Sequence, residues 1–243
     1  MYKVEDEAFL LSKLKFQESS IIVTLLTKNN GIIKGIIRGA FSKKNINIFE
    51  IGNKFNFTAS ARSENNLLKI NAEIIQNNFY EIMKDRNKLM MISIASELIY
   101  KIFPENCPLE FLFEAFESLI FDMQDLNINK IDLYKKYFLF ELLIQKEMGY
   151  ELDLSSCAVC SIEKELHFLS PKTGRAVCFE HGQDYQDKIF KIPKFLLDFS
   201  NSTDMDDILN CANISEHFLK KFYFNQFDKE ISYLRSVLIN NMN

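Results

Sequence analysis

The sequence is short of the residues that break up or extend a chain, with only 7 Gly and 4 Pro among 243 residues. So few argue against long linkers and low-complexity tracts. No apolar run approaches the roughly 18 residues of a membrane-spanning helix. The acidic start of the chain also lacks the layout of a signal peptide. With 47% hydrophobic residues and 26% charged residues, we expect a globular, cytoplasmic protein.

Signatures of the common enzyme classes are missing as well. Gly31, Gly35 and Gly39 are spaced at four, but no Gly-Lys-Ser/Thr phosphate loop contains them. There is no Gly-x-Ser-x-Gly nucleophile elbow. The chain has 3 His, and none has neighbours that indicate a Ser/His/Asp triad. We therefore expect a protein that binds something and is not an enzyme.

Charge is divided unevenly along the chain. Residues 1–80 carry 11 Lys and Arg against 7 Asp and Glu, a net charge of +4. The other residues carry 18 against 26, a net charge of −8, and the whole chain has −4. This asymmetry predicts two regions with different partners.

Hydrophobic periodicity also changes near residue 80. Before it, β-branched and aromatic residues predict five short strands without helices between them, at 9–16, 20–27, 32–38, 55–61 and 67–74. Such strands are typical of a small barrel. After it, apolar residues at helical spacing predict helices within 89–102, 108–123 and 133–148, a helical stretch at 193–199, and a last helix that opens at a capping box, Asn213 to Glu216. We predict an α+β protein with its boundary between residues 79 and 80.

Four residues late in the chain have the spacing of metal ligands. Cys157 and Cys160 form a Cys-x2-Cys pair, and after residues 161–177 Cys178 and His181 form a Cys-x2-His pair. Two such pairs supply the tetrahedral ligand set of a closed structural zinc site. A hairpin at 165–169 and 175–179 would carry the second pair. The alternative is that the cysteines are small buried hydrophobic residues without metal.

Other residues near this pattern are less suited to bind metal. His167 lies in an apolar strand, which favours a role other than ligand. Cys107 and Cys211 lack a paired cysteine, and we expect buried thiols. An open catalytic zinc would need a missing fourth ligand and a general base, and Glu180 is not part of a water-activating motif.

The predicted barrel carries basic residues without nearby acidic ones. No Asp or Glu occurs between Glu18 and Glu50. A positive groove on a small barrel can follow a phosphate backbone while aromatic residues stack on bases. An ordinary solvated loop is the alternative. The predicted DNA-binding residues are Lys28, Lys34, Arg38, Phe41, Lys43 and Lys44, with Lys54 and Arg62 extending the surface.

Several segments along nearly the whole chain together form a recognisable pattern. Arg38-Gly39-Ala40 is followed by the basic residues Lys43 and Lys44, and the stretch from Phe140 through Tyr150 to Cys157 is the most specific. The other segments are residues 7–11, 24–27 with Gly31, 97–98 with 104–105, 170–177 and 234–236. These segments resemble the RecO family of bacterial recombination mediator proteins.

The resemblance implies an OB-fold over residues 1–79 and a helical domain over 80–243, with a zinc-finger-like insertion at about 153–185. It also implies binding to single- and double-stranded DNA, annealing of complementary strands, and cooperation with RecR. Members contact the acidic C-terminal tail of single-strand-binding protein and help RecA to displace that protein. Some members of the family have four Cys at the finger, and others have lost several of these ligands. This chain departs from the four-Cys pattern by placing His181 in the fourth position.

The acidic tail of the partner would need a basic and apolar groove in the helical domain, for which Lys135, Lys136 and Arg235 are candidates. Two alternatives belong to other functional classes. One is a zinc-containing protein-interaction adaptor with only incidental DNA affinity. The other is a metal-dependent nucleic-acid enzyme.

Overall fold

The computed structural model describes residues 2–43, 45, 47–61, 67–227 and 230–242. These residues form two compact units, Met1–Leu126 and Asn127–Asn243, which are considered separately below. The boundary between the two units, after Leu126, comes later in the chain than the change from strands to helices after Gln76, because three helices belong to the first unit.

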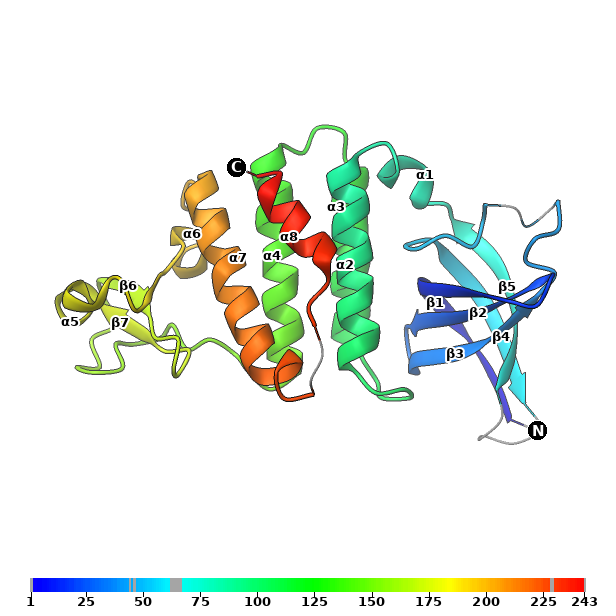
Figure 1. Ribbon diagram of the computed structural model, residues 1–243, viewed down its shortest axis with the longest axis horizontal. Helices are drawn as coiled ribbons and strands as arrows, with labels where there is room; N and C mark the ends of the chain where they lie inside the picture. Colours follow the sequence, from blue (N-terminus) through cyan, green and yellow to red (C-terminus); the bar gives the residue numbers. More distant parts are fainter. Residues whose placement is uncertain (1, 44, 46, 62–66, 228–229, 243) are drawn as a thin grey trace. The chain divides into compact units, whose positions relative to one another are not determined.

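The first unit begins with a five-stranded barrel (Figure 1). The strands pair in the order β1-β2-β3-β5-β4, and β4 pairs again with β1. The seam between the parallel strands β3 and β5 is short, since within the part of the chain that the structure describes it contains only the pairs Gly35–Leu68 and Ile36–Lys69. All five predicted strands are confirmed, at β1 (Tyr2–Phe16), β2 (Ser20–Thr27), β3 (Gly31–Arg38), β4 (Lys54–Ala61) and β5 (Leu68–Gln76).

Alternation of side chains gives the barrel its core. In β4, Phe55, Phe57 and Ala59 are buried, and they join residues of the other strands in one hydrophobic cluster. The turn between β2 and β3 depends on Gly31, which has φ +67°, and a Cβ there would lie 1.8 Å from the carbonyl oxygen of Cys107. This turn therefore requires glycine on two grounds, backbone conformation and space.

Three helices complete the first unit: α1 (Phe79–Ile82), α2 (Arg86–Ile102) and α3 (Glu110–Gln124). Asp85 caps α2 by accepting hydrogen bonds from the backbone N–H groups of Asn87 and Lys88. α3 packs on the barrel through aromatic rings, because Phe9 of β1 lies 5.1 Å from Phe113 and 5.4 Å from Phe116 between centroids.

The second unit is helical with a small sheet inserted. Figure 1 shows its long helices α4 (Lys130–Glu147) and α7 (Met205–Leu219), which pack against each other. The sheet has the order β7-β6-β8. The remaining elements are β6 (Leu166–Leu169), β7 (Ala176–Cys178), α5 (Phe179–Gly182), η1 (Gln183–Tyr185), β8 (Phe190–Lys191), α6 (Lys194–Leu197), the π-helical turn η2 (Lys220–Phe224) and α8 (Tyr233–Asn240).

The capping box predicted at Asn213 is wrong. Asn213 and Glu216 lie inside α7, which begins earlier because the side chain of Asp204 accepts a hydrogen bond from the backbone N–H of Asp207. The predicted single last helix is instead α7, the turn η2 and a separate α8. Gly149 follows α4 with φ +88°, as expected for a residue that ends a helix.

A buried ion pair joins three helices of the second unit. Arg235 of α8 and Glu141 of α4 both have fully buried side chains, and the Arg235 Nη2 to Glu141 Oε2 distance is 2.8 Å. Glu141 also accepts hydrogen bonds from the hydroxyls of Tyr137 and Ser215, the latter on α7.

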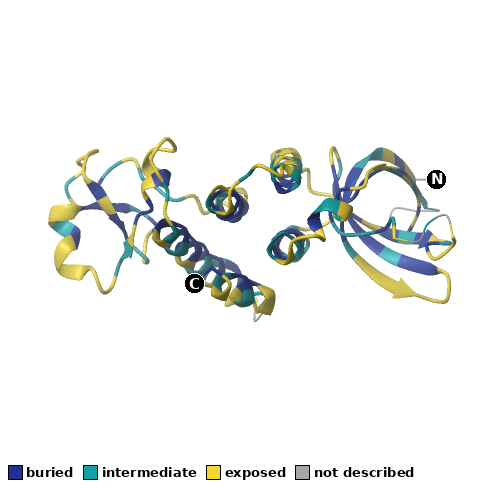
Figure 2. Cartoon of the chain, turned by 90° about the horizontal axis from the view of Figure 1, so that it is seen from above, coloured by how far each residue is buried: buried dark blue, intermediate teal, exposed yellow. Residues whose placement is uncertain are grey.

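Burial in the helices is one-sided, with exposed faces opposite buried ones (Figure 2). Among the described residues, no helix is both long enough and apolar enough to cross a membrane.

Candidate metal site and nucleic-acid interface

The structure brings the four predicted metal ligands together. Cys157 and Cys160 come from the loop before β6, Cys178 ends β7, and His181 lies in α5. One potential ligand atom from each residue lies within 4.8 Å of the other three. This cluster can bind a metal ion.

The distances in the cluster suit a small tetrahedral ion. The Sγ atoms of Cys160 and Cys178 are 3.8 Å apart, and Cys178 Sγ lies 3.1 Å from His181 Nδ1. Zinc–sulfur bonds of about 2.3 Å place two sulfurs of a tetrahedral site about 3.8 Å apart. Three thiolates and one imidazole leave no ligand position open.

Backbone N–H groups around the cluster favour the thiolate form of Cys157. Burial alone would raise the pKa of this thiol, but hydrogen bonds from the backbone of Cys160, Cys178 and Val159 and from the Cys160 side chain lower the pKa to about 6. The pKa of Cys178 is raised: the backbone hydrogen bond from His181 lowers it, but burial and the neighbouring Cys157 and Cys160 side chains outweigh that bond. Thiolates are the form that binds metal.

The loop geometry holds the first pair of cysteines in place. The backbone N–H of Cys157 donates to the carbonyl of Ile162, and that of Ser161 donates to the carbonyl of Cys157. Ser161 has φ +61°, a left-handed conformation that turns the chain back after Cys160. Cys157 and Cys178 also belong to the hydrophobic cluster of the finger.

The remaining Cys and His residues lie elsewhere. His167 is exposed, and its Nδ1 lies 2.8 Å from the carbonyl oxygen of Glu165. Cys211 is fully buried, as expected, and burial raises the pKa of its thiol. The expectation for Cys107 is wrong, since this residue is exposed in the segment that leads into α3.

Most of the predicted DNA-binding residues are on the surface of the barrel. Lys28, Lys34, Arg38 and Lys43 are exposed, and the ring of Phe41 is 49% exposed. Lys34 pairs with Glu105 at 2.9 Å, but both side chains remain about half exposed. Such a pair in water contributes little stability and can give way to a phosphate.

The prediction that Lys54 extends the exposed DNA-binding surface is wrong. Its side chain is only 11% exposed, and its Nζ lies 2.8 Å from Glu7 and 2.7 Å from Glu117. The ammonium also lies over the rings of Phe9 and Phe113. Burial alone would lower the pKa of Lys54, but Glu117 and Glu7 outweigh burial and raise the pKa. Lys54 thus joins the barrel to α3. Lys44 and Arg62 lie outside the described residues.

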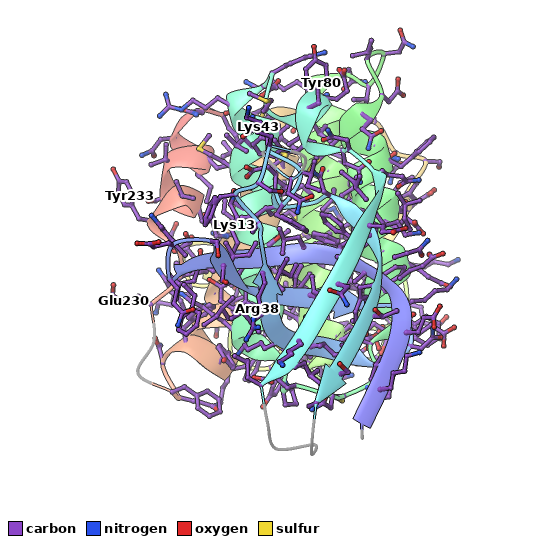
Figure 3. All side chains as sticks on the ribbon, turned by 90° about the vertical axis from the view of Figure 1, so that its right-hand side faces the viewer. Lys13, Arg38, Lys43, Tyr80, Glu230 and Tyr233 are labelled. Carbon is purple, nitrogen blue, oxygen red and sulfur yellow. The ribbon has the colours of Figure 1, made fainter. Side chains whose placement is uncertain are left out.

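The sequence analysis missed basic and aromatic residues at the turn between β1 and β2. Lys15 lies 5.8 Å above the ring of Phe41, and Phe16 is partly exposed beside it in the chain. Figure 3 shows Lys13, Arg38 and Lys43 on the same face of the barrel. Lys13 and Lys15 are separated by one residue near the solvent-exposed end of β1. This spacing places both lysines on one face of the strand, and it could have identified them from the sequence.

A pocket of about 930 Å³ opens beside Lys28 and Arg38. Its lining is mixed in charge, since it includes the carboxylates of Glu5, Asp6, Glu7 and Glu73. Asp6 accepts hydrogen bonds from the backbone and side chain of Asn29 and from the side chain of Asn30, so it fixes the β2–β3 turn. These carboxylates disfavour a phosphate group inside the pocket.

Two of the three helical cations predicted to hold an acidic tail are internal. Arg235 is fully buried in its ion pair with Glu141. Lys135 is buried, and its Nζ donates to the carbonyl of Phe199 and lies 3.8 Å from the centre of that ring. Lys136 is partly exposed.

Comparisons with known proteins agree over nearly the whole chain. The family model described as "Recombination protein O N terminal" matches residues 1–78, and "Recombination protein O C terminal" matches residues 83–221. A "DNA repair protein RecO" of Orientia tsutsugamushi (strain Boryong) is 34% identical over 237 residues, 96% of this chain and 95% of its own. Proteins of the same name from Wolbachia sp. subsp. Drosophila simulans (strain wRi) and Rickettsia bellii (strain OSU 85-389) are 30% and 31% identical, covering 97% and 91% of this chain and 98% and 89% of their own.

Proposed function

Since the chain belongs to the recombination protein O family of DNA repair proteins, we propose that it is a non-enzymatic mediator of recombinational repair. In this role it binds single-stranded DNA, anneals complementary strands and also binds duplex DNA. With RecR, it helps to load RecA onto DNA coated by single-strand-binding protein. The resemblance found in the sequence supplies these partners, and it also indicates a cytoplasmic location at the nucleoid.

One observation carries the DNA-binding proposal: an exposed aromatic ring on the barrel, that of Phe41, lies beneath the exposed Lys15 and within three residues of two further exposed cations. Phe41 offers a face for a base, and Lys15, Arg38 and Lys43 lie on the surrounding strands and loop. Base stacking on an aromatic ring contributes about 1–3 kcal/mol per base. Phosphate neutralisation by the cations would supply the rest of the affinity.

The strand order supports an OB-fold. Five strands in the order β1-β2-β3-β5-β4, with β3 parallel to β5, form a barrel with one short seam. OB-folds bind oligonucleotides on the face of strands 2 and 3 and with the loops after strands 1 and 4. Lys34 and Arg38 lie on β3, and Lys15 lies beside the first of these loops.

The metal cluster fits structural zinc better than catalysis. Its four potential ligands would complete a tetrahedral zinc site, which would leave no position for water or substrate. A bound zinc would tie the β6–β7 hairpin to the loop before it, between segments that otherwise share a small hydrophobic cluster. Chemistry at the metal is therefore no part of the proposal.

Binding and annealing of single-stranded DNA at low salt test the proposal. We expect Lys43→Glu/Lys44→Glu to abolish annealing and to weaken binding at least tenfold. Lys188→Glu, at an exposed lysine of the second unit, is the matched control and should leave both binding and annealing unchanged. Wild-type protein that neither binds nor anneals single-stranded DNA would refute the proposal.

The same variants separate a mediator from an adaptor that only contacts proteins. An adaptor would still support RecA loading with RecR after charge reversal at Lys43 and Lys44. A mediator that depends on its barrel would lose that activity together with annealing. Purified protein should also show no nuclease or hydrolase turnover.

A further inference from the structure

A row of side chains crosses four strands on one face of the barrel wall. The strand register pairs Ile36 of β3 with Lys69 of β5. Lys69 pairs in turn with Ser60 of β4, and Ser60 pairs with Lys3 of β1. Residues that pair across strands project from the same face of a sheet. With neighbouring strands about 4.8 Å apart, the row extends about 14 Å from β3 to β1.

Burial of the adjacent residues shows that this row lies on the outer face. Val4 follows Lys3 and Leu68 precedes Lys69, and both apolar residues belong to the hydrophobic cluster inside the barrel. Because successive side chains of a strand project to opposite faces, the two lysines must project outward. Both are exposed.

The charge of the two lysines is not neutralised by a neighbouring carboxylate. Within the residues that the structure describes, no Asp or Glu forms an ion pair with Lys3 or Lys69. Ser60, which lies between them, is uncharged. Glu5, two residues further along β1, is the start of the acidic part of that strand and limits the positive region on one side. The two ammonium groups therefore give this part of the barrel a positive potential.

The row is continuous with the basic residues already assigned to DNA. Arg38 lies two residues beyond Ile36 on β3, so it projects from the same outer face. It is exposed at the surface of the barrel (Figure 3). Because Ile36 pairs with Lys69, Arg38 and Lys69 are diagonal neighbours on adjacent strands. Below, "the basic row" means Arg38, Lys69 and Lys3.

The side chains around the basic row favour a nucleic acid over an acidic peptide. Ser60 is small and polar, and Thr58 and Asn71, which pair with each other beside it on the same face, are polar too. A peptide tail usually takes its affinity from an apolar or aromatic anchor in a pocket, which these residues do not provide. A phosphate backbone needs only separated cations, because its charge density is high.

We propose that the basic row continues the path of single-stranded DNA around the outside of the barrel. The strand would lie over Phe41, pass Arg38, and cross β5 and β4 to the beginning of β1. This inference rests on the proposed DNA-binding function. It adds Lys3 and Lys69, which the sequence analysis did not select, to the residues that neutralise phosphates.

Two oligothymidylates, of about 5 and about 20 nucleotides, test the proposal on the full chain, because one OB-fold spans about 4–16 nucleotides. The short one should be held at Phe41, and the long one should also reach the basic row. For the long oligonucleotide, Lys3→Gln/Lys69→Gln should make the slope of log affinity against log salt concentration shallower by about 1.4, or about 0.7 for each cation. For the short one, this variant should keep the wild-type slope. Phe41→Ala should weaken binding of both lengths.

Two control variants isolate charge and position. Lys3→Arg/Lys69→Arg keeps the charge, and Lys164→Gln/Lys188→Gln removes two exposed lysines from the second unit. Both should keep the wild-type slope for the long oligonucleotide. All of these lysine variants should keep the wild-type melting temperature, because the substituted side chains are exposed.

Three results would overturn the proposal. The first is a wild-type slope for Lys3→Gln/Lys69→Gln with the long oligonucleotide, and the second is an equal change of slope for both lengths. The third is saturable binding of an Asp/Glu-rich peptide that this variant abolishes while the DNA slopes stay unchanged, because the occupant would then be a peptide. Wild-type protein that binds neither oligonucleotide would instead refute the proposed function on which the basic row depends.

Discussion

Replacing Arg235 with Met should destabilise the second unit strongly. The guanidinium of Arg235 has two neighbouring carboxylates, since Nη2 lies 2.8 Å and Nε 3.1 Å from the two oxygens of Glu141, and Nη1 bonds Glu216. Nη2 also donates to the carbonyl of Ala212 at 2.8 Å. Met fills a similar volume but leaves the carboxylate of Glu141 buried without its cation.

The size of the effect follows from this burial. Removing one partner of a buried ion pair costs about 3–5 kcal/mol, mostly because the other charge stays buried and unpaired. Arg235→Lys should have an intermediate effect, because a single ammonium cannot reproduce the planar fork that bonds Glu141 and Glu216. The exposed pair Lys146–Glu151 is the contrast, and Lys146→Met should have little effect.

Urea unfolding followed by far-ultraviolet circular dichroism measures the loss, since the chain has no Trp for fluorescence. With a slope of about 1–3 kcal/mol per M urea, the midpoint should fall by about 1–5 M. Hydrogen exchange in α4 and α7 should rise in parallel. If Arg235→Met unfolds at the same urea concentration as Lys146→Met, the reasoning about the buried pair is refuted.

Three further changes test other parts of the structure. Gly31→Ala should lower the melting temperature, because φ is +67° and the new Cβ meets the carbonyl of Cys107; an unchanged melting curve would contradict the tight turn. Lys54→Met should leave DNA affinity unchanged and lower the free energy of unfolding. The difference in this free energy between wild type and variant should narrow above pH 10.5, because the ion pairs of Lys54 are lost as the pH rises through its raised pKa. Metal analysis should find about one zinc per chain, and Cys157→Ser should lose it. In metal-free protein, the thiolate absorbance of Cys157 should appear as the pH rises through about 6. A well-folded wild-type protein purified without zinc would contradict the structural role of the metal.

The strands and the metal cluster could be predicted because their signals are local. Each strand has its own run of β-branched and aromatic residues, and the turn at Gly31 falls between two of them. Spacing alone identified Cys157 and His181, since short cysteine pairs present their side chains together regardless of the surrounding fold.

Features that depend on contacts between distant segments could not be predicted in the same way. A lysine in a basic region looks solvated, yet Lys54 is enclosed by Glu117, 63 residues later in the chain. Arg235 likewise pairs with a residue 94 positions earlier. The start of α7 was missed because Asn213 and Glu216 match a capping box, while Asp204 supplies the cap that the structure uses.

The salt dependence of binding to single-stranded DNA tests the central proposal most directly. If Arg38 and Lys43 neutralise phosphates, the logarithm of affinity should fall linearly with the logarithm of salt concentration. Each charge removed, in Arg38→Gln or Lys43→Gln, should make the slope shallower by about 0.7. Lys188→Gln should keep the wild-type slope. Equal slopes for all of these proteins would show that the barrel surface is not where DNA binds.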